Sequence, residues 1–251
     1  MQTPTSIGDT MFYTIKAYDI DSHKRAMPVA LIRAMHEAAM QNVIRLGISV
    51  WDLEPQQLAW VLSNKYVQFE RLPILGERLQ IVTQPAGFEK VFTYRDYLAY
   101  DEKGELVFYA ASTWLLMNTT TRRMMRIPES IRHFEKEVPP IEDCLDRSRI
   151  DFKAFDRGHF EAKFRVDWHD LDFNQHANNV NYIRWMLEVL GSVLSDWQLK
   201  KLEIQFKAEC HWGDELIASA MHLGNKIYLH QLNKVKDGKL LAIARTSWEG
   251  E

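Results

Sequence analysis

The chain has 251 residues and an ordinary globular composition, which allows one large domain or two small ones. Its net charge of −3 and pI near 6.3 give no electrostatic support for a general nucleic-acid-binding role. Two cysteines are too few for a disulfide framework and favour a reducing compartment. The sequence shows no secretory or Arg-rich leader, and no apolar run approaches membrane-spanning length, so we expect a cytoplasmic or already processed protein.

The first half of the sequence predicts one long helix among several strands. A strand is predicted at 12–18, and the helix that follows begins at Pro28 and closes at Gly47. Residues 48–62 look irregular. Strand-like runs then come at 64–69, 77–84, 88–100 and 105–117, followed by a surface connection at 118–132.

The second half repeats this order of elements. Its first strand, 159–168, alternates apolar and charged residues, which predicts one buried and one solvated face. A helix with a largely apolar circumference follows and reaches Leu190. Further strands are predicted at 201–207, 214–222, 226–234 and 239–248, the last two joined by a hairpin at Asp237-Gly238.

The two halves align with one another when Asp21 is placed on Asp172. The alignment also pairs Asp19 with Asp170, Ala26 with Ala177, Val29 with Val180, Ile32 with Ile183, Arg33 with Arg184, Met35 with Met186, Glu37 with Glu188, Gly76 with Gly213, Gly104 with Gly238 and Trp114 with Trp248. A duplicated strand, buried helix and antiparallel strands fit the hot-dog unit, in which a sheet curls around one helix. We therefore predict an α+β double hot-dog, with an N-terminal unit at 1–137, a linker at 138–153 that begins near Val138-Pro139-Pro140, and a C-terminal unit at 154–251.

Three polar residues, Asp172, Asn174 and His176, stand directly before the second helix, where the first half has His23 and Arg25 in place of the last two. The start of a helix presents unpaired backbone N–H groups that can stabilise negative charge. All three residue types also favour turns, so a helix-capping loop is an equally good interpretation of these residues alone. Because the halves differ here, any chemistry is expected in the second half only.

The most specific motif runs from Asp172 to Glu188 and reads Asp-x-Asn-x-His-x-Asn-Asn-Val-x-Tyr-Ile-x-Trp-x-Leu-Glu. With Phe-Lys-Ala-Glu-Cys at 206–210 and the segments 114–118 and 121–128, it resembles the acyl-acyl carrier protein thioesterases of plant plastids and bacteria. The resemblance extends from about residue 12 to the C-terminus. Two departures are the lack of a plastid leader, which suggests a bacterial member, and His211 where glycine usually follows Glu-Cys.

This resemblance implies a hydrolytic site made of Asp172, Asn174, His176 and Glu209. A thioester carbonyl is already reactive, so the site needs only to aim a water molecule and stabilise an oxyanion. Glu209 would be the general base, Asn174 and His176 would orient the thioester and the water, and Asp172 would fix them. Simple strand alternation would instead place Glu209 on a solvated face.

Two other chemistries were weighed at the same site. Cys210 is an alternative nucleophile that His176 would activate to give an acyl-enzyme. A free cysteine is most often a buried small residue, and transfer from one thiol to another gains little, so Glu209 is favoured over Cys210. His169, Asp170, Asp172 and His176 match no metal-ligand spacing, so no metal and no cofactor is predicted.

The family resemblance places the acyl chain in the first half, with the first helix as a wall of its tunnel. The candidate lining residues are Met27, Leu31, Ala34, Met35 and Ala38, which core packing explains equally well. An acidic carrier protein would need a local positive face. The densest candidates are Arg122, Arg123, Arg126 and Arg132, followed by Lys200, Lys201 and Lys207, although such a run is usually a solvated surface.

We therefore expect hydrolysis of fatty acyl-acyl carrier protein to free fatty acid and carrier protein, in the bacterial cytoplasm. The carrier protein is the expected partner, with no nucleic-acid or membrane partner, and the enzyme is expected to be a monomer or homodimer. The alternatives are an acyl-CoA thioesterase and a non-hydrolytic hot-dog protein of acyl-binding or dehydratase-like type, because the fold alone does not fix the reaction.

Overall fold

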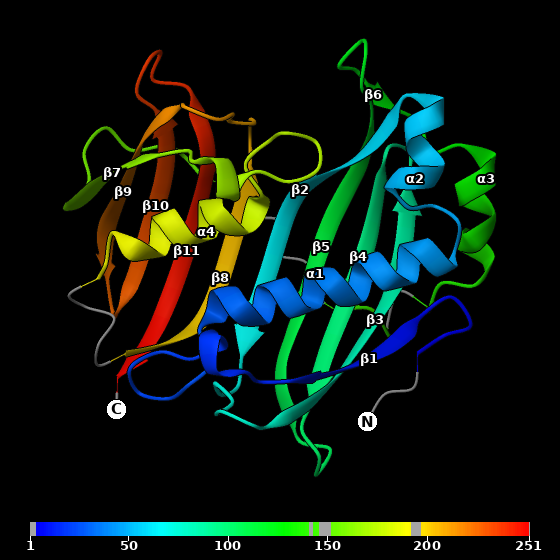
Figure 1. The fold of residues 1–251 in the computed structure, drawn as a ribbon, viewed down its shortest axis with the longest axis horizontal. Helices are drawn as coiled ribbons and strands as arrows, with labels where there is room; N and C mark the ends of the chain where they lie inside the picture. Colours follow the sequence, from blue (N-terminus) through cyan, green and yellow to red (C-terminus); the bar gives the residue numbers. More distant parts are fainter. Residues whose placement is uncertain (1–3, 141–142, 146–151, 192–196, 251) are drawn as a thin grey trace. The chain divides into compact units, whose positions relative to one another are not determined.

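The structure is a computed structural model that describes residues 4–140, 143–145, 152–191 and 197–250 (Figure 1). It divides into two compact units, Met1–Arg147 and Ser148–Glu251. Residues 141–142 and 146–151 of the predicted linker lie outside the described residues.

The N-terminal unit is an antiparallel sheet with a long helix across one face (Figure 1). Its elements are β1 (Asp9–Thr14), α1 (Pro28–Arg45), α2 (Val50–Leu53), β2 (Leu58–Phe69), β3 (Arg78–Glu89), β4 (Phe92–Tyr100), β5 (Leu106–Asn118), β6 (Met124–Met125) and α3 (Glu129–Arg132). Its strands lie in the order β1-β3-β4-β5-β2, and β6 pairs with the end of β5.

The C-terminal unit has the same arrangement. Its elements are β7 (Phe160–Arg165), α4 (Asn179–Glu188), β8 (Trp197–Phe206), β9 (Glu215–Gly224), β10 (Ile227–Lys234) and β11 (Leu240–Gly250). Its strands lie in the order β8-β11-β10-β9-β7, which is the order of the N-terminal unit once each strand is replaced by its repeat. The predicted pair of hot-dog units is therefore confirmed.

The duplication extends to individual hydrogen bonds in the loop before each helix. The Asp21 carboxylate accepts the backbone N–H groups of His23 and Arg25 at 2.8 and 3.0 Å. Asp172 accepts the N–H groups two and four residues later at 2.8 and 3.3 Å. The residue three places after each aspartate has a positive φ, 62° and 61°. This matched loop positions both helix starts and confirms the alignment of the halves.

The first helix begins and ends as the sequence indicates, whereas α4 ends at Glu188, two residues before the predicted Leu190. Pro28 is the first residue of α1, where its missing N–H costs no hydrogen bond. Gly47, with a φ of +66°, follows the end of α1. Asn178 caps α4 by accepting the N–H of Val180 at 3.0 Å.

Several strand predictions were wrong at their ends. The first strand ends at Thr14, and Ala17–Asp19 is a 3-10 turn, as is Trp168–Asp170 after β7. The run 88–100 is a hairpin, because Lys90 has a φ of +51° and turns the chain between β3 and β4. The region 48–62 contains α2 and the start of β2, the connection 118–132 contains β6 and α3, and β8 begins at Trp197.

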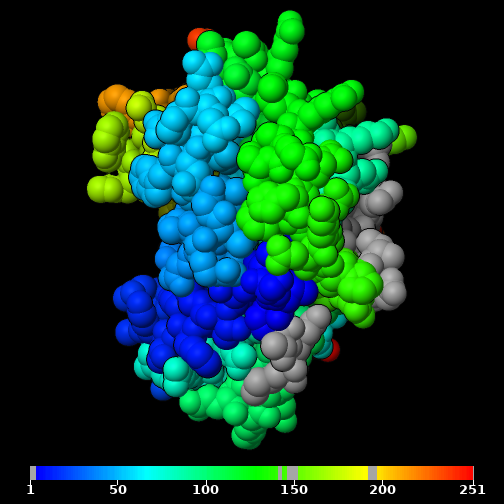
Figure 2. All heavy atoms as spheres, turned by 90° about the vertical axis from the view of Figure 1, so that its right-hand side faces the viewer, coloured from blue at the N-terminus to red at the C-terminus, as the bar shows by residue number. Residues whose placement is uncertain are grey.

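A small apolar core lies beneath α2 and α3 in the N-terminal unit. It contains Ile7, Ile48, Leu53, Leu58, Leu116, Ile127, Ile131 and Phe134. Figure 2 shows the outside of this cluster, where the light-blue residues around α2 lie against the green residues around α3. Burial of this apolar surface explains why the segment after β5 is folded rather than a loose surface connection.

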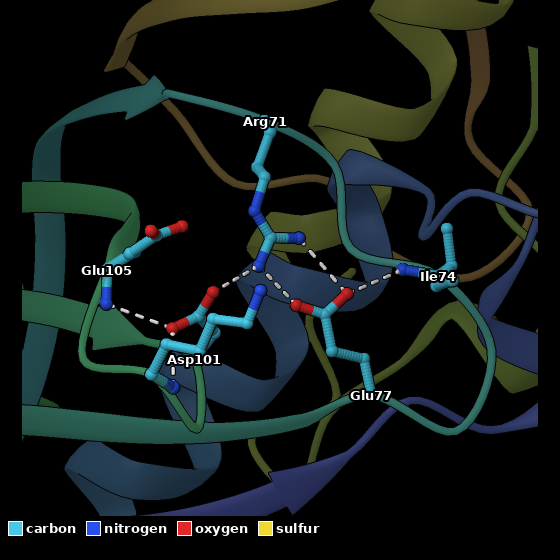
Figure 3. A network of polar contacts seen from close by, with 6 residues as sticks. Arg71, Ile74, Glu77, Asp101 and Glu105 are labelled. Carbon is cyan, nitrogen blue, oxygen red and sulfur yellow. Dashed lines mark hydrogen bonds and ion pairs between the residues drawn. The ribbon is translucent and has the colours of Figure 1, made fainter.

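A network around Arg71 fixes the turn that leads into β3 (Figure 3). The Arg71 guanidinium contacts both carboxylate oxygens of Glu77 and lies 2.8 Å from the Asp101 carboxylate in the loop between β4 and β5. The carbonyl of Pro73 in this turn accepts the N–H of Ala26 at 2.7 Å. The network therefore also anchors the segment that enters α1.

Candidate active site

The candidate site is built on the loop that precedes α4 in the C-terminal unit. The Asp170 carbonyl accepts the N–H of Asn178 at 2.8 Å and the side-chain amide of Asn181 at 2.9 Å. Asp172 is half-buried, and burial raises the pKa of its carboxyl above the ordinary value. Its carboxylate accepts the backbone N–H groups of Asn174 and His176. These two hydrogen bonds fix the backbone of the loop.

His176 and Glu209 come together at this loop. The distance from His176 Nε2 to Glu209 Oε2 is 3.5 Å, and about a quarter of each side chain is exposed, 25% and 27%. The alternation that placed Glu209 on a solvated strand face was wrong, because β8 ends at Phe206 and residues 207–210 are irregular. The chain therefore turns Glu209 toward His176.

Tyr182 on α4 holds the segment that carries Glu209. Its hydroxyl accepts the N–H of Cys210 at 2.9 Å and donates to the carbonyl of Ala208 at 3.2 Å. Both neighbours of Glu209 are thus bound to one side chain. In the sequence Tyr182 is only one residue of the motif at 172–188 on a largely apolar helix, which gives no signal for its contacts with Ala208 and Cys210.

Cys210 is fully buried, and burial raises the pKa of its thiol to about 11. A thiol with that pKa is almost wholly protonated near neutral pH and is a poor nucleophile. The Cys210 carbonyl accepts the N–H of Ala177 at 2.9 Å, the same contact that Pro73 makes with Ala26 in the other repeat. Cys210 therefore has a structural role, because its carbonyl makes a backbone contact that occurs in both repeats.

Asn174 stands two residues before His176 in the same loop. It is exposed, its N–H donates to Asp172, and its side chain makes no hydrogen bond within the part of the chain that the structure describes. The structure thus brings together Asp172, His176 and Glu209 and leaves Asn174 at the open edge of the loop.

His211 completes the surroundings of His176, with the two rings perpendicular and their centroids 5.0 Å apart. The N–H of His211 donates to the Asp214 carboxylate at 2.9 Å, and Lys234 lies 2.7 Å from the same carboxylate. Gly213 in this turn has a φ of +82°, identical to that of its repeat Gly76. Histidine in place of the usual glycine at 211 therefore leaves the turn intact.

No group of three or more His, Cys, Asp or Glu side chains is arranged to hold a metal ion within the described ranges. The described helices also include none that is long and apolar enough to cross a membrane.

The remaining predicted residues lie in the N-terminal unit. Leu31, Ala34, Met35 and Ala38 are buried on α1, and Met27 before it is partly buried. Arg122, Arg123 and Arg126 are exposed around the turn between β5 and β6.

Comparisons with known proteins cover nearly the whole chain. A model of the acyl-ACP thioesterase N-terminal domain matches residues 9–134, and one of the acyl-ACP thioesterase C-terminal domain matches residues 154–250. A chloroplastic palmitoyl-acyl carrier protein thioesterase from Cuphea hookeriana is 30% identical over 94% of this chain, and one from Arabidopsis thaliana is 27% identical over 95%. This chain spans 61% and 63% of the lengths of those relatives.

Two solved structures share the fold. An acyl-ACP thioesterase from Bacteroides thetaiotaomicron superposes with a TM-score of 0.84 at 21% identity, covering 97% of this chain and 98% of that one. A 12:0-ACP thioesterase from Umbellularia californica superposes with a TM-score of 0.85 at 21% identity and covers both chains fully, 100% of each.

Proposed function

This chain belongs to the acyl-ACP thioesterase family, and from that membership we propose that it hydrolyses the thioester of fatty acyl-acyl carrier protein to free fatty acid and carrier protein. The observation that carries the proposal is the approach of His176 to Glu209 at 3.5 Å in the loop before α4. The site lies in the half of the duplication where the sequence differs from its repeat.

In the proposed reaction Glu209 accepts a proton from water as the oxygen attacks the thioester carbonyl. His176 donates a hydrogen bond that orients the water or the thioester, and the exposed amide of Asn174 binds the substrate from the edge of the loop. Asp172 acts as a positioning residue, because its carboxylate holds the N–H groups of Asn174 and His176. The carrier-protein thiolate then leaves and takes up the proton that Glu209 received from water.

We propose that the acyl chain lies against the sheet-facing side of α1 in the N-terminal unit. Leu31 and Met35 are fully buried there, with Ala34 and Ala38 only 2% exposed beside them. We also propose that the protein acts in the bacterial cytoplasm and that it is a monomer or a homodimer.

Substitution of two adjacent residues separates the proposed mechanism from the acyl-enzyme alternative. Glu209→Gln removes the base but keeps the shape, so kcat with acyl-carrier protein should fall by about 100-fold or more, as expected for loss of a general base. Cys210→Ala should keep most of the activity, because the buried thiol stays protonated. Release of free thiol measures both variants.

The reverse pattern, an inactive Cys210→Ala and an active Glu209→Gln, would replace this mechanism with covalent catalysis. Equal hydrolysis of the coenzyme A and carrier-protein thioesters would favour an acyl-CoA thioesterase. Failure of the wild-type protein to release thiol from either substrate would leave a non-hydrolytic hot-dog protein.

A further inference from the structure

The N-terminal unit buries a row of polar side chains between α1 and its sheet. Lys65 on β2 stands opposite Ser112 on β5, which stands opposite Arg95 on β4. Lys65 lies 2.6 Å from His36 of α1, so the row is on the face that the helix covers. Lys65 is 2% exposed and Arg95 is 7% exposed. A chain bound beneath α1 would therefore meet polar groups as well as apolar ones.

Lys65 and His36 form a pair of nitrogen groups, in which Lys65 is buried and His36 is partly buried. Within the described residues Lys65 makes no ion pair with a carboxylate, and its one hydrogen bond is to His36 Nε2. Burial lowers the pKa of Lys65 to about 7, and burial together with the Lys65 charge lowers the pKa of His36 well below its ordinary value. The pair therefore carries N–H donors without a carboxylate to accept them.

Tyr97 adds a donor beside this pair. It is fully buried, its ring centroid is 5.3 Å from Lys65 Nζ, and its hydroxyl makes no hydrogen bond within the described ranges. Such unsatisfied buried groups are uncommon in folded proteins. At the matching place in the other repeat, His230 lies 3.1 Å from the Met186 carbonyl and 2.8 Å from the Thr246 hydroxyl. His230 thus has a partner at both ring nitrogens, whereas the Tyr97 hydroxyl has no hydrogen bond of normal geometry and only Ser112, the counterpart of Thr246, beside it.

The C-terminal unit is an internal control for whether the fold needs these polar groups. Trp114 and Trp248 each donate the indole N–H to the hydroxyl two residues earlier, at 2.8 Å in both units, which fixes the alignment of β5 with β11. From the strand registers and the helix alignment, Lys65 corresponds to Leu202, Arg95 to Tyr228, Thr83 to Ala220 and His36 to Leu187. The hot-dog unit accepts leucine at both places, so Lys65 and His36 are not requirements of the fold.

We propose that Lys65, His36 and Tyr97 bind an oxygen function, a hydroxyl, keto or carboxylate group, on the acyl chain of the substrate. This inference rests on the proposed function, because it takes the acyl chain to lie against α1. The three side chains come from different elements, α1, β2 and β4; Lys65 and Tyr97 supply the donors, and His36 Nε2 holds Lys65 in place. A plain alkyl chain would leave these buried donors without partners, and sites of this kind discriminate strongly against the analogue that lacks the polar group.

The test compares acyl-carrier protein substrates of one chain length that differ in the chain alone. The set contains the unsubstituted chain, hydroxy and keto chains with the oxygen at successive positions, and a chain ending in a carboxylate. For the wild-type enzyme, kcat/KM for at least one oxygenated chain should exceed that of the unsubstituted chain by about tenfold or more. Calorimetric binding of the matching free acids should show the same order.

Two variants connect the preference to the site. Lys65→Leu combined with His36→Leu copies the leucines of the C-terminal repeat and should reduce the oxygenated-to-unsubstituted ratio of kcat/KM about tenfold. Tyr97→Phe removes one hydroxyl from a buried ring, so a folded protein with a smaller loss in the same ratio is expected. Tyr228→Phe makes the same change in the other unit and should leave the ratio unaltered.

A preference for the terminal carboxylate would assign the site to an anion, and a preference for hydroxyl or keto chains would assign it to a neutral acceptor. The proposal is overturned if the wild-type enzyme and the free-acid binding both favour the unsubstituted chain, or if neither variant changes the ratio. Those results leave the proposed hydrolysis intact. Absence of all hydrolysis would instead contradict the proposed function, and binding of the free acids would still report the preference of the cluster.

Discussion

His230 shows how a single buried residue makes the stability of the protein depend on pH. Both ring nitrogens have partners inside the C-terminal unit, and burial lowers the pKa of the imidazole to about 4 from 6.5. The unfolded chain therefore takes up the proton first as the pH falls. The stabilisation is fully present above about pH 6.5 and is lost progressively toward pH 4.

The free energy of unfolding should fall by about 3 kcal/mol between those pH values, because each unit of pKa difference is worth roughly 1.4 kcal/mol. Urea unfolding at a series of pH values measures it, with His230→Gln as the variant that cannot titrate. His36, whose pKa is also lowered, should keep part of the pH dependence in that variant. Identical pH profiles for the two proteins would show that His230 is not buried in its neutral form.

The sequence predicted residue contacts only where a local motif carried them. The loop around Asp172 and the cap at Asn178 were predictable, because each is a contact within four residues. The approach of Glu209 to His176 came from the family resemblance, since no periodic pattern relates residues 33 positions apart across an irregular segment. The link between Tyr182 and Cys210 spans 28 residues and had no sequence signal.

At the scale of elements, the segment between β8 and β9 carries Glu209 without being part of a strand. Its geometry depends on contacts with α4, of which the Tyr182 hydroxyl is the clearest. The helices and the order of strands were predictable because hydrophobic periodicity and the internal repeat report them directly. The hairpin at Lys90 was not, since a lysine with a positive φ of +51° leaves no glycine or asparagine to mark the turn.

Tyr182→Phe tests the role of α4 in placing Glu209. Loss of the hydroxyl frees the N–H of Cys210 and the carbonyl of Ala208 on either side of Glu209, the proposed general base. We expect kcat to fall by about tenfold, because small displacements of a catalytic group are costly, while the ring keeps the fold. Tyr228→Phe is the control on β10, and an equal loss of kcat in both variants would make the effect one of general packing.

At the scale of the whole molecule, one hot-dog unit occurs twice with the same strand order and the same loop before each helix. The copies differ in their polar residues. The C-terminal copy brings His176 and Glu209 together, whereas the N-terminal copy buries Lys65 beneath its helix, in contact with His36 of that helix. The sequence did not predict this buried lysine, because strand runs such as 64–69 do not reveal which side of the sheet a lysine faces.

A partner surface for the acidic carrier protein is tested by reversing charge at the exposed turn between β5 and β6. Arg122→Glu with Arg123→Glu should raise KM for the carrier-protein thioester several-fold, because like charges would then repel. The coenzyme A thioester of the same acyl chain should change much less. Paired kinetics on the two thioesters measure the difference, and equal changes in both KM values would remove these arginines from the docking surface.

The most direct test of the assignment of hydrolysis to the C-terminal copy uses the duplication itself. His176 and Arg25 occupy the same place in the two repeats, each with its backbone N–H bound to the preceding aspartate. Single-turnover release of free fatty acid from acyl-carrier protein should fall by about 100-fold or more in His176→Ala and stay within a few-fold of wild type in folded Arg25→Ala. Full activity in His176→Ala, or an equal loss of activity in Arg25→Ala, would contradict the assignment of hydrolysis to the C-terminal copy.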